Sequence, residues 1–391
     1  MFSADNVLSA LTCQSLRRQL RTIDEIEGTR IQIGDRQLVN FASNDYLGLS
    51  QHPILREAAK QAIDRFGVGT GASRLITGST SLHARLEEQL SLLKSTEAAL
   101  TFGSGYAAAV GTIPSIVTSD DVIIIDKLSH ACLIDAAKLS GAILRVYQHN
   151  DLTKLQDHLA WAQQKHPDRT ILIVTESVFS MDGDLGALAA IVDLKDRFGA
   201  TLLVDEAHAT GVFSKQGEGL IHELHLTDRV EVQMGTLSKA IGVSGGFICG
   251  SRSLIDLLIN RARSFIYSTA PPPAVAAAAS AAVELIQSSE GARLRERLWK
   301  NIRHLWQVLP EPRRMAEQPS SPIVPIIVGE ESKAVAAANA IFASGYFAPA
   351  IRYPTVKRGS ARLRVTLSSA HTKEQIDGLA GVLGRGERPP T

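Results

Sequence analysis

The chain has 391 residues, 45% of them hydrophobic, so it can bury a large core and is expected to form two domains. Lys and Arg number 41 and Asp and Glu 40, which leaves a formal charge of +1 and no net field to hold nucleic acid or an anionic membrane. The three cysteines are widely separated, and the N-terminus does not have the charge order of a secretory signal. Since there is also no apolar run of about 18 residues, the expected location of the protein is a reducing cytoplasm.

Four short apolar runs rich in β-branched residues occupy the middle of the chain. They are predicted strands at 121–126, 142–147, 170–176 and 201–206. Because these runs are apolar at nearly every position, we expect strands that are buried on both faces of a sheet. The segments 130–141 and 185–199 between them have apolar residues at helical spacing and a glycine near the end. This alternation predicts an α/β fold with a mostly parallel sheet.

The pattern changes after the proline run at 271–273. An alanine-rich segment at 274–286 and an amphipathic stretch at 294–309 are predicted helices. Predicted strands of a smaller α+β domain follow at 321–329, 346–354 and 361–368. The expected organisation is an N-terminal segment, a large domain and a small C-terminal domain, at 1–47, 48–275 and 276–391.

Three short motifs are compatible with other functions, but each lacks a necessary partner. VDEAH at 204–208 has the spelling of a helicase Walker B segment, yet the chain has no Gly-Lys dipeptide to form a phosphate-binding loop. GVSGG at 242–246 fits the GxSxG pattern of a serine hydrolase, with Ser244 as nucleophile and His371 as base, in a poor strand–turn–helix context. The glycine run at 67–71 lacks the dinucleotide spacing. The hydrolase is kept as the alternative from a different class.

Asp205, His208 and Lys239 form the most informative group. Asp205 ends a predicted buried strand, at the edge where open α/β sheets bind ligands, and the less favoured alternative for this residue alone is a helix cap or a buried ion pair. Lys239 lies among glycine and serine residues rather than on a polar helix face. Pyridoxal phosphate needs a lysine to hold its aldehyde and a carboxylate to keep its pyridine nitrogen protonated. The group therefore indicates a pyridoxal-phosphate enzyme.

Longer motifs resemble a known family over nearly the whole chain. The segments that carry the resemblance lie at 40–53, 69–90, 104–106, 126–142, 175–188, 204–220, 235–248, 265–273 and 361–372. On these segments the chain resembles the α-oxoamine synthases, a family of fold-type I pyridoxal-phosphate transferases. The resemblance implies an aspartate-aminotransferase-like α/β fold with a smaller C-terminal α+β domain. It also implies a C-acyltransferase activity that depends on pyridoxal 5'-phosphate.

The resemblance assigns residues to the cofactor's ring. Lys239 would hold the aldehyde, and Asp205 would pair with the pyridine nitrogen. His130 would stack on the ring, and Ser129 is the predicted N-cap of a helix whose partial positive charge favours a neutral imidazole there. The residues at or near the phenolic oxygen would be His208, Ser180 and Glu176. Lys239, His130, Asp205 and His208 are the expected catalytic residues.

The phosphate of the cofactor is expected to bind mainly to backbone N–H groups. The residues implied are Gly105, Tyr106, Thr236 and Thr269. Thr269 would reach the phosphate from a second subunit, which implies a homodimer with shared active sites. Ala109 stands where the family often has Asn, so one side-chain contact is in doubt.

For the substrates, Asn44 and Arg364 match positions that grip the amino acid's carboxylate, a group suited to the planar guanidinium. Arg352 matches an arginine of the small domain that moves on closure, and Arg17, or Arg18 if the alignment slips by one residue, would contact the acyl carrier. The motif spelling favours L-alanine and a pimeloyl thioester, on CoA or acyl carrier protein, as substrates in biotin biosynthesis. Glycine with acetyl-CoA or succinyl-CoA is the alternative pair.

Overall fold

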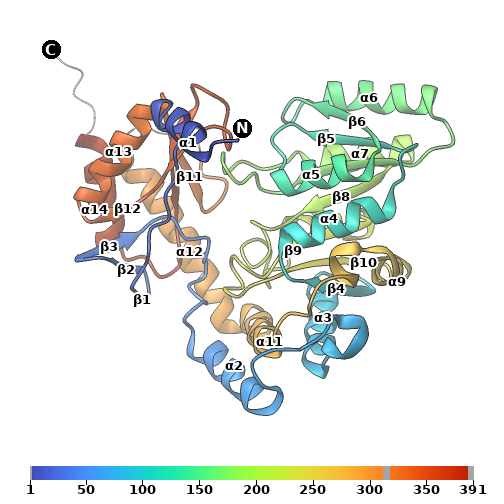
Figure 1. The fold of residues 1–391 in the computed structure, drawn as a ribbon, viewed down its shortest axis with the longest axis horizontal. Helices are drawn as coiled ribbons and strands as arrows, with labels where there is room; N and C mark the ends of the chain where they lie inside the picture. The colour runs from blue at the N-terminus through green and yellow to red at the C-terminus, as the bar shows by residue number, and fades with distance from the viewer. Residues whose placement is uncertain (1, 311–317, 386–391) are drawn as a thin grey trace. The chain divides into compact units, whose positions relative to one another are not determined.

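The computed structural model describes residues 2–310 and 318–385 (Figure 1). The chain divides into two compact units. The larger unit comprises Leu49–Ser180 and Asp184–Arg295, and the smaller unit comprises Met1–Gly48, Met181–Gly183 and Glu296–Thr391. No helix among the described residues is long and apolar enough to cross a membrane. The cysteines are free thiols, with Cys13 exposed and Cys132 and Cys249 buried.

A seven-stranded sheet forms the centre of the larger unit. Its strands, in spatial order, are β4 (Ala98–Phe102), β10 (Gly246–Gly250), β9 (Val232–Thr236), β8 (Thr201–Asp205), β7 (Ile171–Glu176), β5 (Val122–Asp126) and β6 (Ile143–Tyr147). β10 runs antiparallel to both of its neighbours, whereas β9, β8, β7, β5 and β6 are parallel to one another. The predicted α/β fold with a mostly parallel sheet is confirmed.

The four predicted strands correspond to β5, β6, β7 and β8. β5 and β7 are buried at every residue, as expected for strands covered on both faces. β6 differs, because only its last residue, Tyr147, is buried. The prediction of burial on both faces is wrong for β6, since this strand lies at the edge of the sheet and has a neighbour on one side alone.

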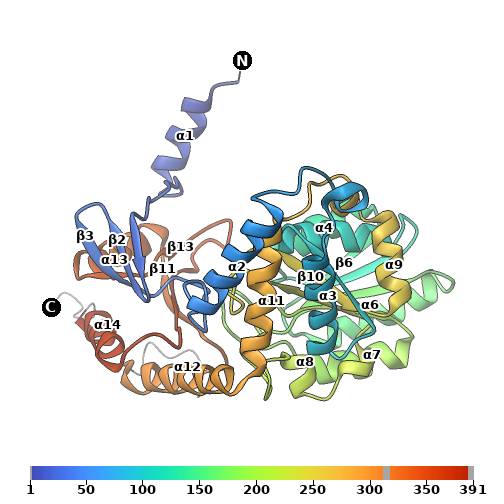
Figure 2. The same cartoon turned by 90° about the horizontal axis from the view of Figure 1, so that it is seen from below.

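Helices surround this sheet (Figures 1 and 2). They are α2 (Pro53–Phe66), α3 (Ser81–Leu93), α4 (Gly105–Ile116), α5 (Ala131–Ser140), α6 (Leu152–Lys165), α7 (Leu188–Phe198), α8 (Leu220–Glu223), α9 (Arg252–Arg261), α10 (Arg263–Ile266) and α11 (Pro273–Gln287). The two predicted glycine stops are confirmed, because Gly141 ends α5 with φ 75° and Gly199 ends α7 with φ 61°. One apolar cluster joins α4, α5 and α9 to a face of the sheet. α6 and α7 pack against each other, and their buried residues lie outside this cluster.

The smaller unit contains two short sheets. One has the order β1 (Glu25–Glu27), β2 (Arg30–Ile33), β3 (Arg36–Asn40) and β12 (Tyr346–Phe347), and the other has β11 (Ile323–Gly329), β14 (Ala361–Thr366) and β13 (Ala350–Ile351). Its helices are α1 (Ala4–Cys13), α13 (Glu331–Ala343) and α14 (Lys373–Arg385). The predicted strand at 346–354 is in fact two short strands, β12 and β13, which belong to different sheets.

The division into units differs from the boundaries expected at 47/48 and 275/276. The N-terminal strands pair with β12, so the first 48 residues belong to the smaller unit. α11 packs against α2 and α3, so it belongs to the larger unit, and the chain leaves that unit after Arg295. The long amphipathic helix α12 (Ser289–Val308) makes this connection. Sheet pairing and helix packing between distant segments therefore set the division.

Candidate active site

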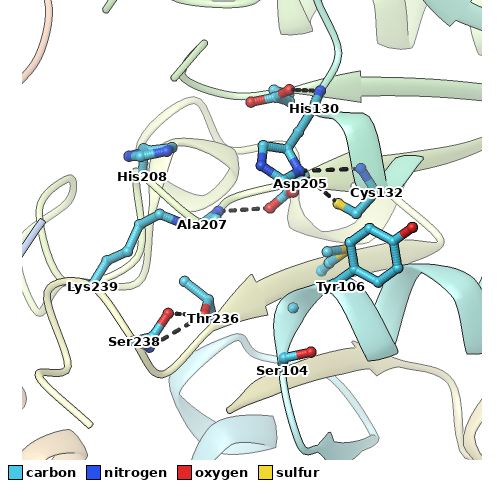
Figure 3. Close-up of a pocket in the computed structure, with 13 residues that line it drawn as sticks. Ser104, Tyr106, His130, Cys132, Asp205, Ala207, His208, Thr236, Ser238 and Lys239 are labelled. Atoms are coloured by element: carbon cyan, nitrogen blue, oxygen red, sulfur yellow. Dashed lines mark hydrogen bonds between the residues drawn. The ribbon is translucent and has the colours of Figure 1, made fainter. Parts of the chain in front are cut away.

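A pocket of about 230 Å³ opens in the larger unit (Figure 3). The carboxyl ends of β7, β8 and β9 contribute to it, as does the N-terminus of α4. Its lining residues are Ser104, Gly105, Tyr106, His130, Cys132, Glu176, Asp205, Ala207, His208, Met234, Thr236, Ser238 and Lys239. Parallel strands end at the same edge of a sheet, so residues from distant parts of the sequence meet here.

Asp205 is the last residue of β8 and is 5% exposed. Its Oδ1 accepts a hydrogen bond from Ala207 N at 2.8 Å. Burial raises the pKa of the Asp205 carboxyl, while the positive charge of Lys239 acts in the opposite direction. The side chain therefore offers a poorly solvated carboxylate that gains from a cationic partner in the pocket.

His130 rather than Ser129 caps the helix that follows. The Nδ1 of His130 accepts from Cys132 N at 3.2 Å, whereas Ser129 Oγ is buried with no hydrogen-bond partner among the described residues. The prediction of Ser129 as N-cap is therefore wrong by one residue. An accepting Nδ1 carries no proton, and burial lowers the pKa of His130, with Asp205 opposing and Lys239 adding to the effect. Both observations favour the neutral form of the imidazole.

Glu176 ends β7 directly beside the end of β8, in register with Asp205. Its Oε1 accepts from the backbone N of His130, which fixes the start of the turn into α5. Burial raises the pKa of Glu176 well above its usual range, and the neighbouring Asp205 carboxylate adds to the rise. Glu176 thus supports the position of His130 through the backbone.

Lys239 lies in the turn between β9 and β10, and its side chain points toward Ala207 and His208 (Figure 3). The turn is closed by a hydrogen bond from Gly242 N to Lys239 O at 2.8 Å. Gly242 has a φ of 76°, and a Cβ there would lie 2.6 Å from the backbone N of Ser50. The turn that presents the amine of Lys239 to the pocket therefore requires a glycine at position 242.

The N-terminus of α4 forms one end of the pocket. Ser104 caps this helix by accepting from Ala107 N at 3.0 Å, and the N–H groups of the first turn, at Gly105 and Tyr106, lie at the positive end of the helix. Thr236 Oγ1 donates to Gly245 O at 2.8 Å and accepts from Ser238 N at 3.2 Å. A Cβ at Gly105 would lie 3.8 Å from Thr236, which is an ordinary contact distance, so the two residues are close neighbours at this end of the pocket.

Several lining residues were missed by the sequence analysis. They are Ser104, Cys132, Ala207, Met234 and Ser238. The N-cap signal before α4 and the serine next to the lysine would have indicated Ser104 and Ser238. Of the predicted cofactor residues, buried Ser180 and exposed Thr269 are not among the lining residues of this pocket in the described chain. Thr269 instead forms an isolated β-bridge with Ser73.

The smaller unit brings Asn44 and Arg364 together. Arg364 Nη1 donates to Asn44 Oδ1 at 3.0 Å, and Tyr46 Oη donates to the same oxygen at 3.2 Å. Burial raises the pKa of Tyr46 to about 12, with Arg364 acting in the opposite direction. Arg364 is 6% exposed, so its charge is held in a mostly desolvated position. Tyr46 is a further residue that the sequence analysis missed.

The other predicted substrate arginines also lie in the smaller unit. Arg352 donates to the backbone carbonyls of Ser15 and Arg17, and burial lowers its pKa. Arg18 donates to Tyr353 O and Thr355 Oγ1, at 3.4 Å in both cases. Arg17 and Arg18 are exposed. The segment before β1 is thus attached to the loop after β13, and the predicted arginines are neighbours.

The residues of the alternative motifs have structural roles. His371 Nδ1 accepts from Ser368 N, and its Nε2 lies 3.0 Å from Asn40 O, so neither ring nitrogen is available as a base. Burial lowers the pKa of His371 to about 4. Glu206 of the VDEAH segment is fully buried and accepts from Lys94 Nζ at 2.6 Å. These contacts argue against the hydrolase and helicase readings.

Comparisons with known proteins agree with this geometry. The aminotransferase class I and II family matches residues 36–383. The 8-amino-7-oxononanoate synthase of Geobacter sulfurreducens is 44% identical, over 97% of this chain and 96% of that protein. A serine palmitoyltransferase from S. paucimobilis with a bound PLP–myriocin aldimine matches with a TM-score of 0.92 and 26% identity, over 98% and 96% of the two chains. An 8-amino-7-oxononanoate synthase from Francisella tularensis matches with a TM-score of 0.75 and 28% identity, over 89% of this chain and 97% of that chain.

The fold and the pocket define a pyridoxal-phosphate-dependent transferase of fold type I. The chain belongs to the aminotransferase class I and II family. The predictions of the family, the fold class, the enzyme class and pyridoxal 5'-phosphate as cofactor are therefore confirmed. The relatives at 40–45% identity carry the name of the synthase activity that the sequence predicts, so the predicted place in biotin biosynthesis is confirmed as well.

Proposed function

We propose that the chain joins L-alanine to a pimeloyl thioester, with loss of carbon dioxide and the thiol, to give 8-amino-7-oxononanoate. The observation that carries this proposal is the pocket of the larger unit, where a lysine, a buried carboxylate and a neutral imidazole face one cavity. Relatives named for this synthase activity support the choice of substrates.

The donor set of the pocket fits pyridoxal 5'-phosphate. Asp205 offers a desolvated carboxylate for the protonated pyridine nitrogen, and Lys239 offers an amine for the aldehyde. The backbone N–H groups at the start of α4 suit a phosphate, and both Gly105 and Tyr106 line the pocket. We assign His130 to the face of the ring, because a neutral imidazole stacks without adding charge.

The residues of the site are assigned separate roles in the reaction. Bound pyridoxal phosphate accepts the electron pair left on the amino acid's α-carbon when a proton or carbon dioxide departs. Lys239 would hold the aldehyde when the cofactor is bound, and its free amine would take the α-proton of L-alanine and later return one to the product. Asp205 keeps the pyridine nitrogen protonated, which maintains the pull on that electron pair. His208, which lines the pocket, is assigned to the phenolic oxygen, and Ser180, which does not line it, is assigned to the same oxygen on the family resemblance alone.

Substrate recognition is assigned to the smaller unit. Arg364 and Asn44 would bind the carboxylate of L-alanine, because a buried guanidinium with fixed geometry suits a planar anion. Arg352 would organise the segment before β1 through its carbonyl contacts. Arg17 or Arg18 would contact the carrier end of the pimeloyl thioester, because both side chains are exposed to solvent.

A homodimer is part of the proposal. Three exposed apolar side chains, Val68, Ile76 and Tyr267, are 78%, 75% and 72% exposed. Ile76 and Tyr267 lie close in the sequence to the bridged residues Ser73 and Thr269, and exposed apolar residues that gather on one face are typical of an interface. Burial of this face against a second subunit would bring Thr269 to the partner's phosphate.

Sedimentation should find a dimer, and Ile76→Glu should shift the protein toward the monomer. A wild-type monomer with full activity would exclude shared active sites.

The decisive experiment measures thiol release and product mass with each substrate pair. L-Alanine with pimeloyl-CoA or pimeloyl-acyl carrier protein should release thiol and give 8-amino-7-oxononanoate, and the faster of the two identifies the carrier. Glycine with acetyl-CoA or succinyl-CoA is the competing pair. A preference for glycine of about tenfold, which corresponds to about 1.4 kcal/mol, would contradict the proposal. Thiol release without any amino acid would indicate a hydrolase.

A further inference from the structure

Outside the lining of the pocket, His149 lies between two carboxylates. Its Nδ1 is 3.2 Å from both oxygens of Asp126, and its Nε2 is 2.6 Å from Asp184 Oδ2. Its ring packs edge-on against Phe179, with the centroids 4.3 Å apart. Burial lowers the pKa of His149, but the bonds to the two carboxylates outweigh this effect and raise the pKa to about 10. The ring is therefore an imidazolium at neutral pH, with one N–H for each carboxylate.

Asp126 controls the turn that leads to His130. It is the last residue of β5 and is fully buried. Its Oδ1 accepts from Leu128 N at 2.8 Å, and its Oδ2 accepts from Asn150 N at 3.0 Å. Its backbone carbonyl accepts from Ser129 N at 3.1 Å. Because these bonds close the turn immediately before His130, the position of Asp126 sets the position of the His130 ring.

Asp184 closes a second loop, which carries Ser180. The carbonyl of Asp184 accepts from Phe179 N at 3.0 Å, so the two ends of this loop are held together. The Oδ1 of Asp184 is buried without a hydrogen-bond partner among the described residues, and its Oδ2 bonds to His149. The charge of Asp184 is therefore compensated by the imidazolium.

We propose that His149 is a positioning residue, whose ring joins the turn carrying His130 to the loop carrying Ser180. The inference rests on the proposed function, which assigns both of these residues to the cofactor. Without a cation at position 149, the buried Asp126 carboxylate loses its cationic partner, whereas the Asp184 side chain, 42% exposed, is left to solvent. The two loops keep the link through Asn150, which donates to Asp126 Oδ2 and to Leu185 O, but they lose the direct bridge between the carboxylates. The His130 ring is then displaced from the cofactor, although no group that touches the cofactor has been removed.

The test compares three variants of the full chain after reconstitution with pyridoxal phosphate. His149→Gln removes the charge, and His149→Arg restores a cation with two donors. His158→Gln, at a half-buried histidine on α6, is the matched control. We expect His149→Gln to weaken the affinity for pyridoxal phosphate about tenfold and to lower kcat more than the KM for L-alanine changes. The visible circular dichroism of the bound cofactor should also fall in His149→Gln. His149→Arg should recover most of the cofactor affinity and most of the dichroism.

Wild-type affinity and dichroism in His149→Gln, with only a lower melting temperature, would show that the ring is merely structural and would overturn the proposal. If this variant does not fold, Asp184→Asn breaks the same bridge from its other end and leaves the turn at Asp126 intact. Asp184→Asn should then reduce the cofactor dichroism, and an unchanged signal would also contradict the proposal. A wild-type protein that binds no pyridoxal phosphate would instead refute the proposed function, so the two failures are distinguishable.

Discussion

Arg364 donates a hydrogen bond to Asn44 over 3.0 Å, although 320 positions separate the two residues in the sequence. The pairing depends on backbone bonds that hold the Asn44 segment along β14, from Thr366 N to Phe41 O and from Ser369 N to Tyr46 O, both at 2.8 Å. The amide therefore fixes one edge of the guanidinium, and this arrangement prepares the arginine for a planar anion before any substrate arrives.

Arg364→Ala should weaken recognition of the amino acid's carboxylate. Loss of a charge-assisted hydrogen bond costs about 1.5–3 kcal/mol, so the KM for L-alanine should rise roughly 10- to 100-fold with a smaller change in kcat. Arg56→Ala, at an exposed residue of α2, is the control and should leave KM unchanged. An unaltered KM in Arg364→Ala would mean that the carboxylate binds elsewhere.

Lys239→Ala should abolish the covalent link to the cofactor. Borohydride reduction of the wild-type protein should attach pyridoxal phosphate permanently to Lys239, because reduction traps the bond between the aldehyde and an amine. Peptide mass spectrometry locates the label. Lys138→Ala, on the exposed face of α5, should be labelled like the wild-type protein. A label on another lysine would refute the assignment.

Asp205→Asn should keep the fold and bind the cofactor, yet lose activity by at least about 10²-fold, or about 2.7 kcal/mol. An amide cannot hold the pyridine nitrogen protonated, so the ring withdraws electrons less strongly. Rates of product formation, together with the visible spectrum, separate lost chemistry from lost cofactor. Near wild-type turnover with the cofactor bound would assign Asp205 a purely structural role.

His371 should make the stability of the protein depend on pH. Burial lowers its pKa from 6.5 to about 4, so its contribution to the free energy of unfolding is fully present above pH 6.5 and is lost as pH falls through 4. The shift corresponds to about 3 kcal/mol. The free energy of unfolding, measured in urea at several pH values, should fall less steeply in His371→Gln than in the wild-type protein between pH 6.5 and 4. An identical slope in both proteins would show that other groups cause the loss.

Ser244→Ala discriminates the hydrolase alternative from the proposed synthase. Ser244 is exposed in the turn between β9 and β10. Because the synthase chemistry depends on Lys239 in this turn, the variant should retain thiol release in the presence of L-alanine. Loss of all thiol release, with the cofactor still bound, would restore the serine nucleophile as a candidate.

The sequence by itself determined the features that depend on residues close together in the chain. Apolar runs located β5, β7 and β8, glycine stops located the ends of α5 and α7, and motif spelling placed Asp205 and Lys239 near one pocket. These features follow from local periodicity and turn chemistry, because each is set by a short segment. The prediction of Ser129 as the cap is wrong by one residue, since Ser129 and His130 are both polar and only the folded turn selects between them.

Only the tertiary structure decided which distant residues meet. The exposure of β6, the assignment of α11 to the larger unit and the split of the predicted strand at 346–354 all depend on partners far away in the sequence. The same is true of the His149 bridge, whose two carboxylates lie 23 and 35 positions away. Such contacts arise when whole strands and helices pack, and the free energy of that packing is a property of the assembled fold rather than of any short segment.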